Sequence, residues 1–118
     1  MPYPRDKPRR GEIYWVDWTP ARGSEQAGRR PGVVISIDSF NARMPVVCIA
    51  ALTTKIKPGI GAGISVVLPA GRPLNAMSQI LPFQVMTVDQ VRLSGFMAAL
   101  APDQLDDLAT KLRLCWGL

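Results

Sequence analysis

Short apolar blocks, separated by polar and turn-forming residues, run along most of the chain and are typical of β-strands. The blocks are rich in β-branched and aromatic residues, and glycine, proline or polar residues bound them. Pro82 interrupts the last block, and because proline has no backbone N–H to donate, we expect a bulge there. The pattern predicts strands at residues 12–18, 32–37, 46–52, 64–68 and 76–88.

The C-terminal residues follow a different period, because their apolar side chains recur every three or four positions and so predict an amphipathic helix. Pro102 and Asp103 suit its first turn, Lys111 and Arg113 its last turn, and Gly117 its end. The apolar stripe comprises Leu105, Leu108, Ala109, Leu112, Cys115 and Trp116. The expected fold is therefore mainly β with a C-terminal α-helix, in which the helix covers a small β-barrel.

The remaining segments predict loops. Residues 20–31 hold two glycines and three arginines without a hydrophobic period, and they are too long for a tight hairpin, so they form a candidate functional loop. Residues 38–45 predict a turn, and residues 54–63 a second loop that carries lysines and glycines. Residues 1–9, rich in proline and basic side chains, predict a flexible arm before a single domain at residues 10–118.

Composition limits the class of protein. The chain has 118 residues, of which 47% are apolar, and this suits one globular domain. Its apolar runs fall well short of the roughly 18 residues of a membrane span, and its N-terminus does not resemble a signal peptide, so we expect a cytoplasmic protein. Cys48 and Cys115 each sit in an apolar run and are expected to be buried thiols rather than a disulfide or metal site.

The sequence contains no histidine. This removes the most common general base, the most common metal ligand and every Ser-His or Cys-His nucleophile pair. Carboxylates, hydroxyls and arginines remain, and arginine can stabilise negative charge without readily losing its own proton. We therefore expect an anionic substrate and neither a metal nor a cofactor.

Charge is unevenly distributed. Residues 1–57 hold ten Lys/Arg and five Asp/Glu, whereas residues 58–118 hold four of each, so the net charge of +5 arises in the first half. A basic surface of this kind suits a nucleic acid, because cationic side chains release the counterions condensed on phosphates. Composition alone is equally compatible with charge that serves only solubility.

Three motifs together resemble the MazF/PemK family of type II toxin-antitoxin endoribonucleases, also called mRNA interferases. They are RRGEIYWVDWTPARGSEQAGRRPGVVIS from Arg9, then DSFN, then a strand that ends in ALTT, with a weaker QVMTVD segment and the C-terminal helix extending the likeness. The resemblance implies an SH3-like barrel that forms a homodimer. It also implies metal-independent cleavage of single-stranded RNA, inhibition of translation and growth, and neutralisation by a cognate antitoxin that occupies the RNA groove.

The resemblance also implies the catalytic residues. Arg30, which precedes Pro31, matches the catalytic arginine, whose guanidinium can stabilise the phosphoryl oxygens during attack by a ribose 2′-OH. Thr53 matches a threonine whose hydroxyl can donate to the phosphate, although such residues at strand ends usually serve turns. Glu25 is either the base for the 2′-OH or a structural partner of loop amides.

The surrounding loops and strand ends supply the expected RNA contacts. Arg29 is expected to contact phosphate, and Gln84 a base edge or the RNA backbone. The complete set is Ser24, Gln26, Arg29, Asn41, Lys55, Lys57 and Gln84.

The chain departs from some family members at the segment around Gln84. Those members carry an Asp directly before this glutamine and Arg residues at two nearby positions, where this chain has Phe83, Leu81 and Met86. A mechanism that uses the Asp/Arg pair is therefore closed to this protein, and cleavage specificity does not transfer. Phe83 could stack on a base or belong to the core.

Two other classes of protein share this kind of barrel. A toxin of the same fold inhibits DNA gyrase by binding, and a non-catalytic SH3-like domain would bind RNA or peptide without cleaving it. Glu25, Arg30 and Thr53 favour the endoribonuclease, because a module that only binds has no reason to assemble them.

Overall fold

The computed structural model describes residues 3–17, 28–59 and 63–118. In these residues one antiparallel sheet of six strands is accompanied by two α-helices and a 3-10 turn. The elements are β1 (Glu12–Asp17), β2 (Arg29–Val34), α1 (Asp38–Arg43), β3 (Val46–Thr53), β4 (Val66–Leu68), β5 (Ser78–Asp89), η1 (Gln90–Arg92), β6 (Leu93–Ala99) and α2 (Pro102–Trp116).

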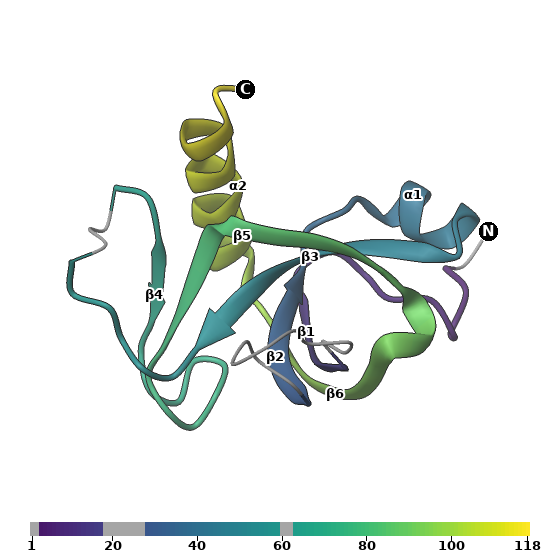
Figure 1. The fold of residues 1–118 in the computed structure, drawn as a ribbon, viewed down its shortest axis with the longest axis horizontal. Helices are drawn as coiled ribbons and strands as arrows, with labels where there is room; N and C mark the ends of the chain where they lie inside the picture. Colours follow the sequence, from purple (N-terminus) through teal and green to yellow (C-terminus); the bar gives the residue numbers. More distant parts are fainter. Residues whose placement is uncertain (1–2, 18–27, 60–62) are drawn as a thin grey trace.

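The strands lie in the order β4-β5-β3-β2-β1-β6. Figure 1 shows that the sheet curls into a half-barrel, with α2 standing beside β5. The predicted class, mainly β with a C-terminal helix, is confirmed. Gly117 ends α2 in a left-handed conformation with φ of 72°, which glycine adopts without steric cost.

A large bulge interrupts the pairing of β3 with β5, as Pro82 predicted. Ala50 pairs with Val85 and the next residue of β3, Ala51, pairs with Leu81, so residues 82–84 have no partner on β3. The indole N–H of Trp116 donates a hydrogen bond of 2.9 Å to the Pro82 carbonyl. The end of α2 is therefore tied to the bend in β5.

Apolar side chains pack on both faces of the sheet because successive residues of a strand point to opposite sides. Val33 belongs to the cluster on the α2 side, and its neighbour Val34 to the cluster inside the curl. The first cluster also contains Ile13, Ala50, Leu52, Val66, Leu68, Ile80, Leu100 and Leu108, and the second Val16, Val47, Ile49 and Val88. Burial on both faces explains why the central strands read as continuous apolar runs.

The predicted set of elements needs correction at three places. Residues 38–45 are not a simple turn, because α1 occupies 38–43. The turn was predicted because aspartate, serine and asparagine, which occur in this segment, are frequent in turns. β6 was missed, because its sequence LSGFMAA combines serine and glycine with partly exposed apolar residues. β2 begins inside the predicted 20–31 loop, since Asp17 pairs with Arg29 and Val16 with Arg30.

Smaller differences concern the cysteines and the N-terminal segment. Cys48 and Cys115 are half-buried rather than fully buried. The predicted arm makes specific contacts, because the Tyr3 hydroxyl donates to the Pro8 carbonyl at 2.6 Å and Lys7 Nζ to Gln90 Oε1 at 3.1 Å. No helix among the described residues combines the length and hydropathy that crossing a bilayer requires.

Leu108→Ala should lower the free energy of unfolding by about 3 kcal/mol, because Leu108 is fully buried between α2 and the sheet and truncation leaves a cavity. Chemical denaturation measures the loss. Val91→Ala is the control, since Val91 is 89% exposed, and it should change stability by less than about 0.5 kcal/mol. Equal effects of the two substitutions would contradict the packing described for α2.

Candidate functional site

A groove lies where β2, β3 and the bulge of β5 meet. A pocket of about 170 Å³ and a wider one of about 420 Å³ adjoin at this place and share five lining residues. Both are lined by Arg30, Pro31, Ala51, Leu52 and Gln84. The antiparallel pairing of β2 with β3 explains the meeting, because it sets the start of β2 beside the end of β3.

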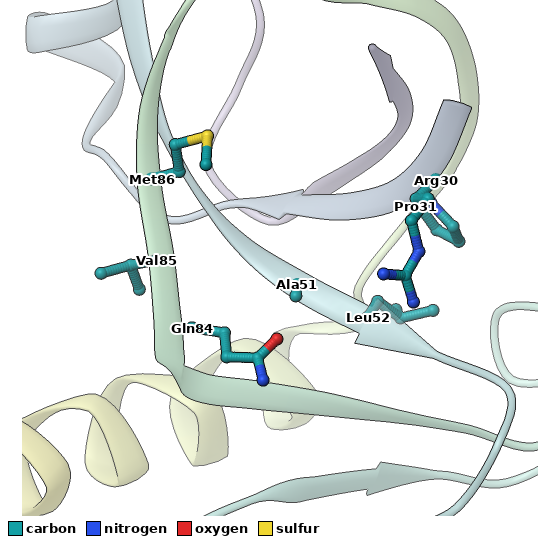
Figure 2. A pocket seen from close by; sticks show the side chains of 7 residues that line it. All are labelled: Arg30, Pro31, Ala51, Leu52, Gln84, Val85 and Met86. Carbon is teal, nitrogen blue, oxygen red and sulfur yellow. The ribbon is translucent and has the colours of Figure 1, made fainter. Parts of the chain in front are cut away.

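Arg30 and Gln84 face this groove from opposite sides. Figure 2 shows the Arg30 guanidinium and the Gln84 amide extending from β2 and β5 toward the space in front of β3. Arg30 is half-buried, and Pro31 restricts the backbone that follows it. Gln84 is exposed and is the last of the three bulge residues without a partner on β3. The bend in β5 therefore brings an amide opposite the candidate catalytic arginine.

One end of the groove is strongly cationic. Arg29, Arg30, Lys55 and Lys57 line the wider pocket, and no carboxylate is among its described lining residues. The hydroxyl groups of two threonines lie at the same end, on Thr53 and Thr54. Such a surface attracts an anion and offers several hydrogen-bond donors to phosphate oxygens.

Hydrogen bonds shape the loop that carries the two lysines. The Thr53 hydroxyl accepts the backbone N–H of Lys55 at 3.0 Å, which is the turn role, and its own proton remains available to donate. The backbone N–H of Lys57 donates to Gln79 Oε1 at 2.8 Å, and Gln79 Nε2 donates to Ser65 Oγ at 3.0 Å. Because Gln79 is fully buried, it holds the loop from inside the protein.

Arg29 is held at the rim of the wider pocket. Its Nε donates to Ser94 Oγ at 2.9 Å, and its guanidinium lies 5.4 Å from the centre of the Trp15 ring. The Ser94 hydroxyl in turn donates to the Trp15 carbonyl at 3.3 Å. Sequence reasoning missed Trp15, because register shifts between β1 and β6 disturb the alternation of inward and outward residues.

The other end of the groove is apolar. It is lined by Ala51, Val85 and Met86, so a thioether side chain lies where the family resemblance suggested an arginine. Leu81, at another of the departing positions, is 2% exposed and pairs with Ala51, whereas Phe83 is half-buried in the bulge. The groove therefore joins a cationic end to an apolar one.

Not every predicted contact residue lies at this groove. Asn41 is fully buried in α1, where it hydrogen-bonds with the Ser36 hydroxyl and donates from Nδ2 to the Ser36 carbonyl at 2.9 Å. Its amide supports the scaffold, so the expected RNA contact is corrected to a structural role. Ser24, Glu25 and Gln26 lie outside the described residues. The structure brings together Arg29, Arg30, Thr53, Lys55, Lys57 and Gln84.

Comparison with known proteins agrees with the motifs. The family model described as PemK-like, MazF-like toxin of type II toxin-antitoxin system matches residues 9–115. MazF from Deinococcus radiodurans is 27% identical with a TM-score of 0.75, and the match covers 95% of this chain and 98% of that one. MazF in a MazE-MazF complex from the same organism is 28% identical with a TM-score of 0.75, covering 94% and 96%. An endoribonuclease from a mycobacterial species, in complex with its cognate antitoxin, shares the fold at 21% identity and a TM-score of 0.77, covering 94% and 96%.

Trp116→Phe should destabilise the protein by about 1 kcal/mol, because a phenyl ring keeps part of the packing but cannot donate the hydrogen bond to the Pro82 carbonyl at the bulge. Chemical denaturation of the wild type and the variant measures this. Gln84→Ala, which changes an exposed side chain of the same bulge, serves as control and should shift stability by less than about 0.5 kcal/mol. A Trp116→Phe protein as stable as the wild type would mean that the tie does not hold β5.

Proposed function

The chain belongs to the PemK-like, MazF-like toxins of type II toxin-antitoxin systems, and from this we propose that it is a sequence-specific endoribonuclease of single-stranded RNA. One observation carries the proposal. The groove gathers four cationic side chains and two threonines, without a carboxylate among its described lining residues. This composition suits a phosphodiester whose charge increases during reaction.

The proposed reaction uses the RNA's own 2′-OH as nucleophile and needs no metal ion. The 2′-oxygen forms a bond to the adjacent phosphorus and the bond from phosphorus to the 5′-oxygen breaks. The leaving 5′-oxygen takes up a proton from water, so the products are a 2′,3′-cyclic phosphate and a 5′-OH. Arg30 stabilises the charge on the phosphoryl oxygens with paired N–H donors, and Thr53 donates its hydroxyl proton to one of them. Lys55 and Lys57 neutralise flanking phosphates, and Gln84 contacts a base edge or the RNA backbone.

The proton of the 2′-OH needs an acceptor. We assign this role to Glu25, the carboxylate of the GSEQ segment, which lies outside the described residues. A structural role for Glu25, as a partner of loop amides, is the alternative. Glu25→Gln distinguishes the two roles, because loss of the base alone slows cleavage while leaving stability unchanged.

The same groove explains how such a toxin would be controlled. An acidic antitoxin segment that lies along the cationic end of the groove would exclude RNA by occupying the same surface. We further propose that the protein acts as a homodimer in the cytoplasm. Apolar side chains at the end of α2 and just after it are 51% to 88% exposed and offer a surface to a second copy. They belong to Leu114, Trp116 and Leu118.

The purified protein should cut a long single-stranded RNA in the presence of EDTA and leave 5′-OH ends. An oligonucleotide with 2′-deoxyribose at the cleaved nucleotide should resist, because it lacks the nucleophile. Mapping the cut sites on the long RNA gives the recognition sequence. Cleavage of the deoxy substrate, or loss of activity in EDTA, would contradict the proposed reaction, and inhibition of gyrase without RNA cleavage would favour the binding-only toxin.

Arg30→Ala should slow single-turnover cleavage at saturating protein by about 100-fold or more, since one transition-state donor is worth about 10²–10³ in rate. Arg30→Lys should restore only part of the rate, because a lysine cannot donate in the bidentate geometry of a guanidinium. Arg43→Ala removes an exposed arginine of α1 as control and should leave the rate unchanged. An Arg30→Ala protein that cleaves at the wild-type rate would remove Arg30 from the reaction.

A further inference from the structure

The side chain of Arg29 lies over a tryptophan ring and is tied to a serine. Its guanidinium lies 5.4 Å from the centre of the Trp15 ring, and its Nε is engaged by Ser94 Oγ at 2.9 Å. Ser94 is fixed in turn by its bond to the Trp15 carbonyl. Trp15 of β1 and Ser94 of β6 therefore fix the position of one guanidinium on β2.

This arrangement restricts how Arg29 can contact a phosphate. The side-on fork of arginine uses Nε together with one terminal nitrogen, and Ser94 already occupies the Nε proton, so only the two terminal nitrogens remain for an anion. Arg30, the next residue, instead extends into the groove toward Gln84, as Figure 2 shows. The two adjacent arginines thus have different surroundings and suit different tasks.

An exposed guanidinium held on an aromatic ring can itself receive a planar ligand. Bases of single-stranded RNA stack on aromatic rings and on arginine planes, and sequence-tolerant stacking of this kind is common in RNA-binding grooves. Trp15 is 37% exposed, and Arg29 is exposed as well. Gly95, which pairs with Trp15 on β6, presents no side chain to cover the ring.

We propose that Trp15 and Arg29 form a stacking platform for one nucleobase of single-stranded RNA, beside the phosphate held at Arg30. The proposal rests on the proposed RNA substrate. Both platform residues line the wider pocket together with Arg30, Lys55 and Lys57, so a strand whose phosphates lie along these cations passes the platform. Ser94 acts as a positioning residue that keeps the guanidinium over the Trp15 ring.

The test separates base-dependent from phosphate-dependent binding. The probes are a 12-nucleotide oligoadenylate and an abasic ribose-phosphate strand of the same length and charge. Arg29→Lys, which retains the charge but not the plane, should weaken binding of oligoadenylate at least fivefold and leave binding of the abasic strand and its salt dependence unchanged. Trp15→Leu should also weaken binding of oligoadenylate. Ser94→Ala leaves the Trp15 ring in place and should weaken the same binding by a smaller factor, so the test remains decisive even if the Trp15→Leu protein misfolds.

Lys55→Gln is the matched phosphate control, which should weaken binding of both strands equally and reduce the salt slope by about one. Arg29→Lys binding that is unchanged for both strands, or weakened equally for both, would overturn the platform. Failure of the platform is distinguishable from failure of the proposed reaction. If the protein binds oligoadenylate through Arg29 but does not cut RNA, the platform is supported and the proposed nuclease activity is contradicted. If it cuts RNA but Arg29→Lys leaves oligoadenylate binding unchanged, the nuclease activity is supported and the platform is contradicted.

Discussion

The three residues of β5 that lack partners on β3 set the geometry on which the rest of the molecule depends. Because the register advances by four residues on β5 for one on β3, the sheet bends at residues 82–84. On one side of the bend, β5 pairs with β4 and packs against α2, and on the other it follows β3 along the curl. The bend also lifts Gln84 to the groove, and Trp116 secures it at Pro82. Core, helix and site therefore meet at one irregularity of the sheet.

The local sequence predicted those elements whose residues have strong conformational preferences or a clear apolar period. Pro82 predicted the bulge, because proline has no N–H to donate to a neighbouring strand and is therefore found at bulges when it occurs inside a sheet. The apolar stripe around Leu108 and the glycine after Trp116 predicted α2. By contrast, β6 was missed, because a strand at the end of a sheet with one exposed face mixes serine, glycine and apolar residues. The helical turn of α1 depends on the packing of Asn41 against Ser36, which no local pattern specifies.

The candidate site was accessible from the sequence only through motif resemblance. Charge placed the cations in the first half of the chain, but it could not show that Arg30 and Lys57 line the same pocket. That proximity follows from the antiparallel pairing of β2 with β3, which places the start of β2 beside the end of β3. The supporting residues Gln79 and Trp15 were not predicted. One is a buried polar side chain within an apolar strand, and the other lies in a strand whose register shifts.

The groove is made of four parts of the chain, at residue 15 and at residues 29–31, 51–57 and 81–86, that are apart in the sequence and adjacent only after folding. Any ligand that spans them therefore binds the native state and not the unfolded chain. Its binding free energy adds to the stability of the fold, and the gain rises with the logarithm of ligand concentration over the dissociation constant. An occupied chain consequently unfolds less often than an empty one and presents fewer cleavable segments to proteases. The cellular lifetime of the protein is then tied to the abundance of whatever occupies its groove.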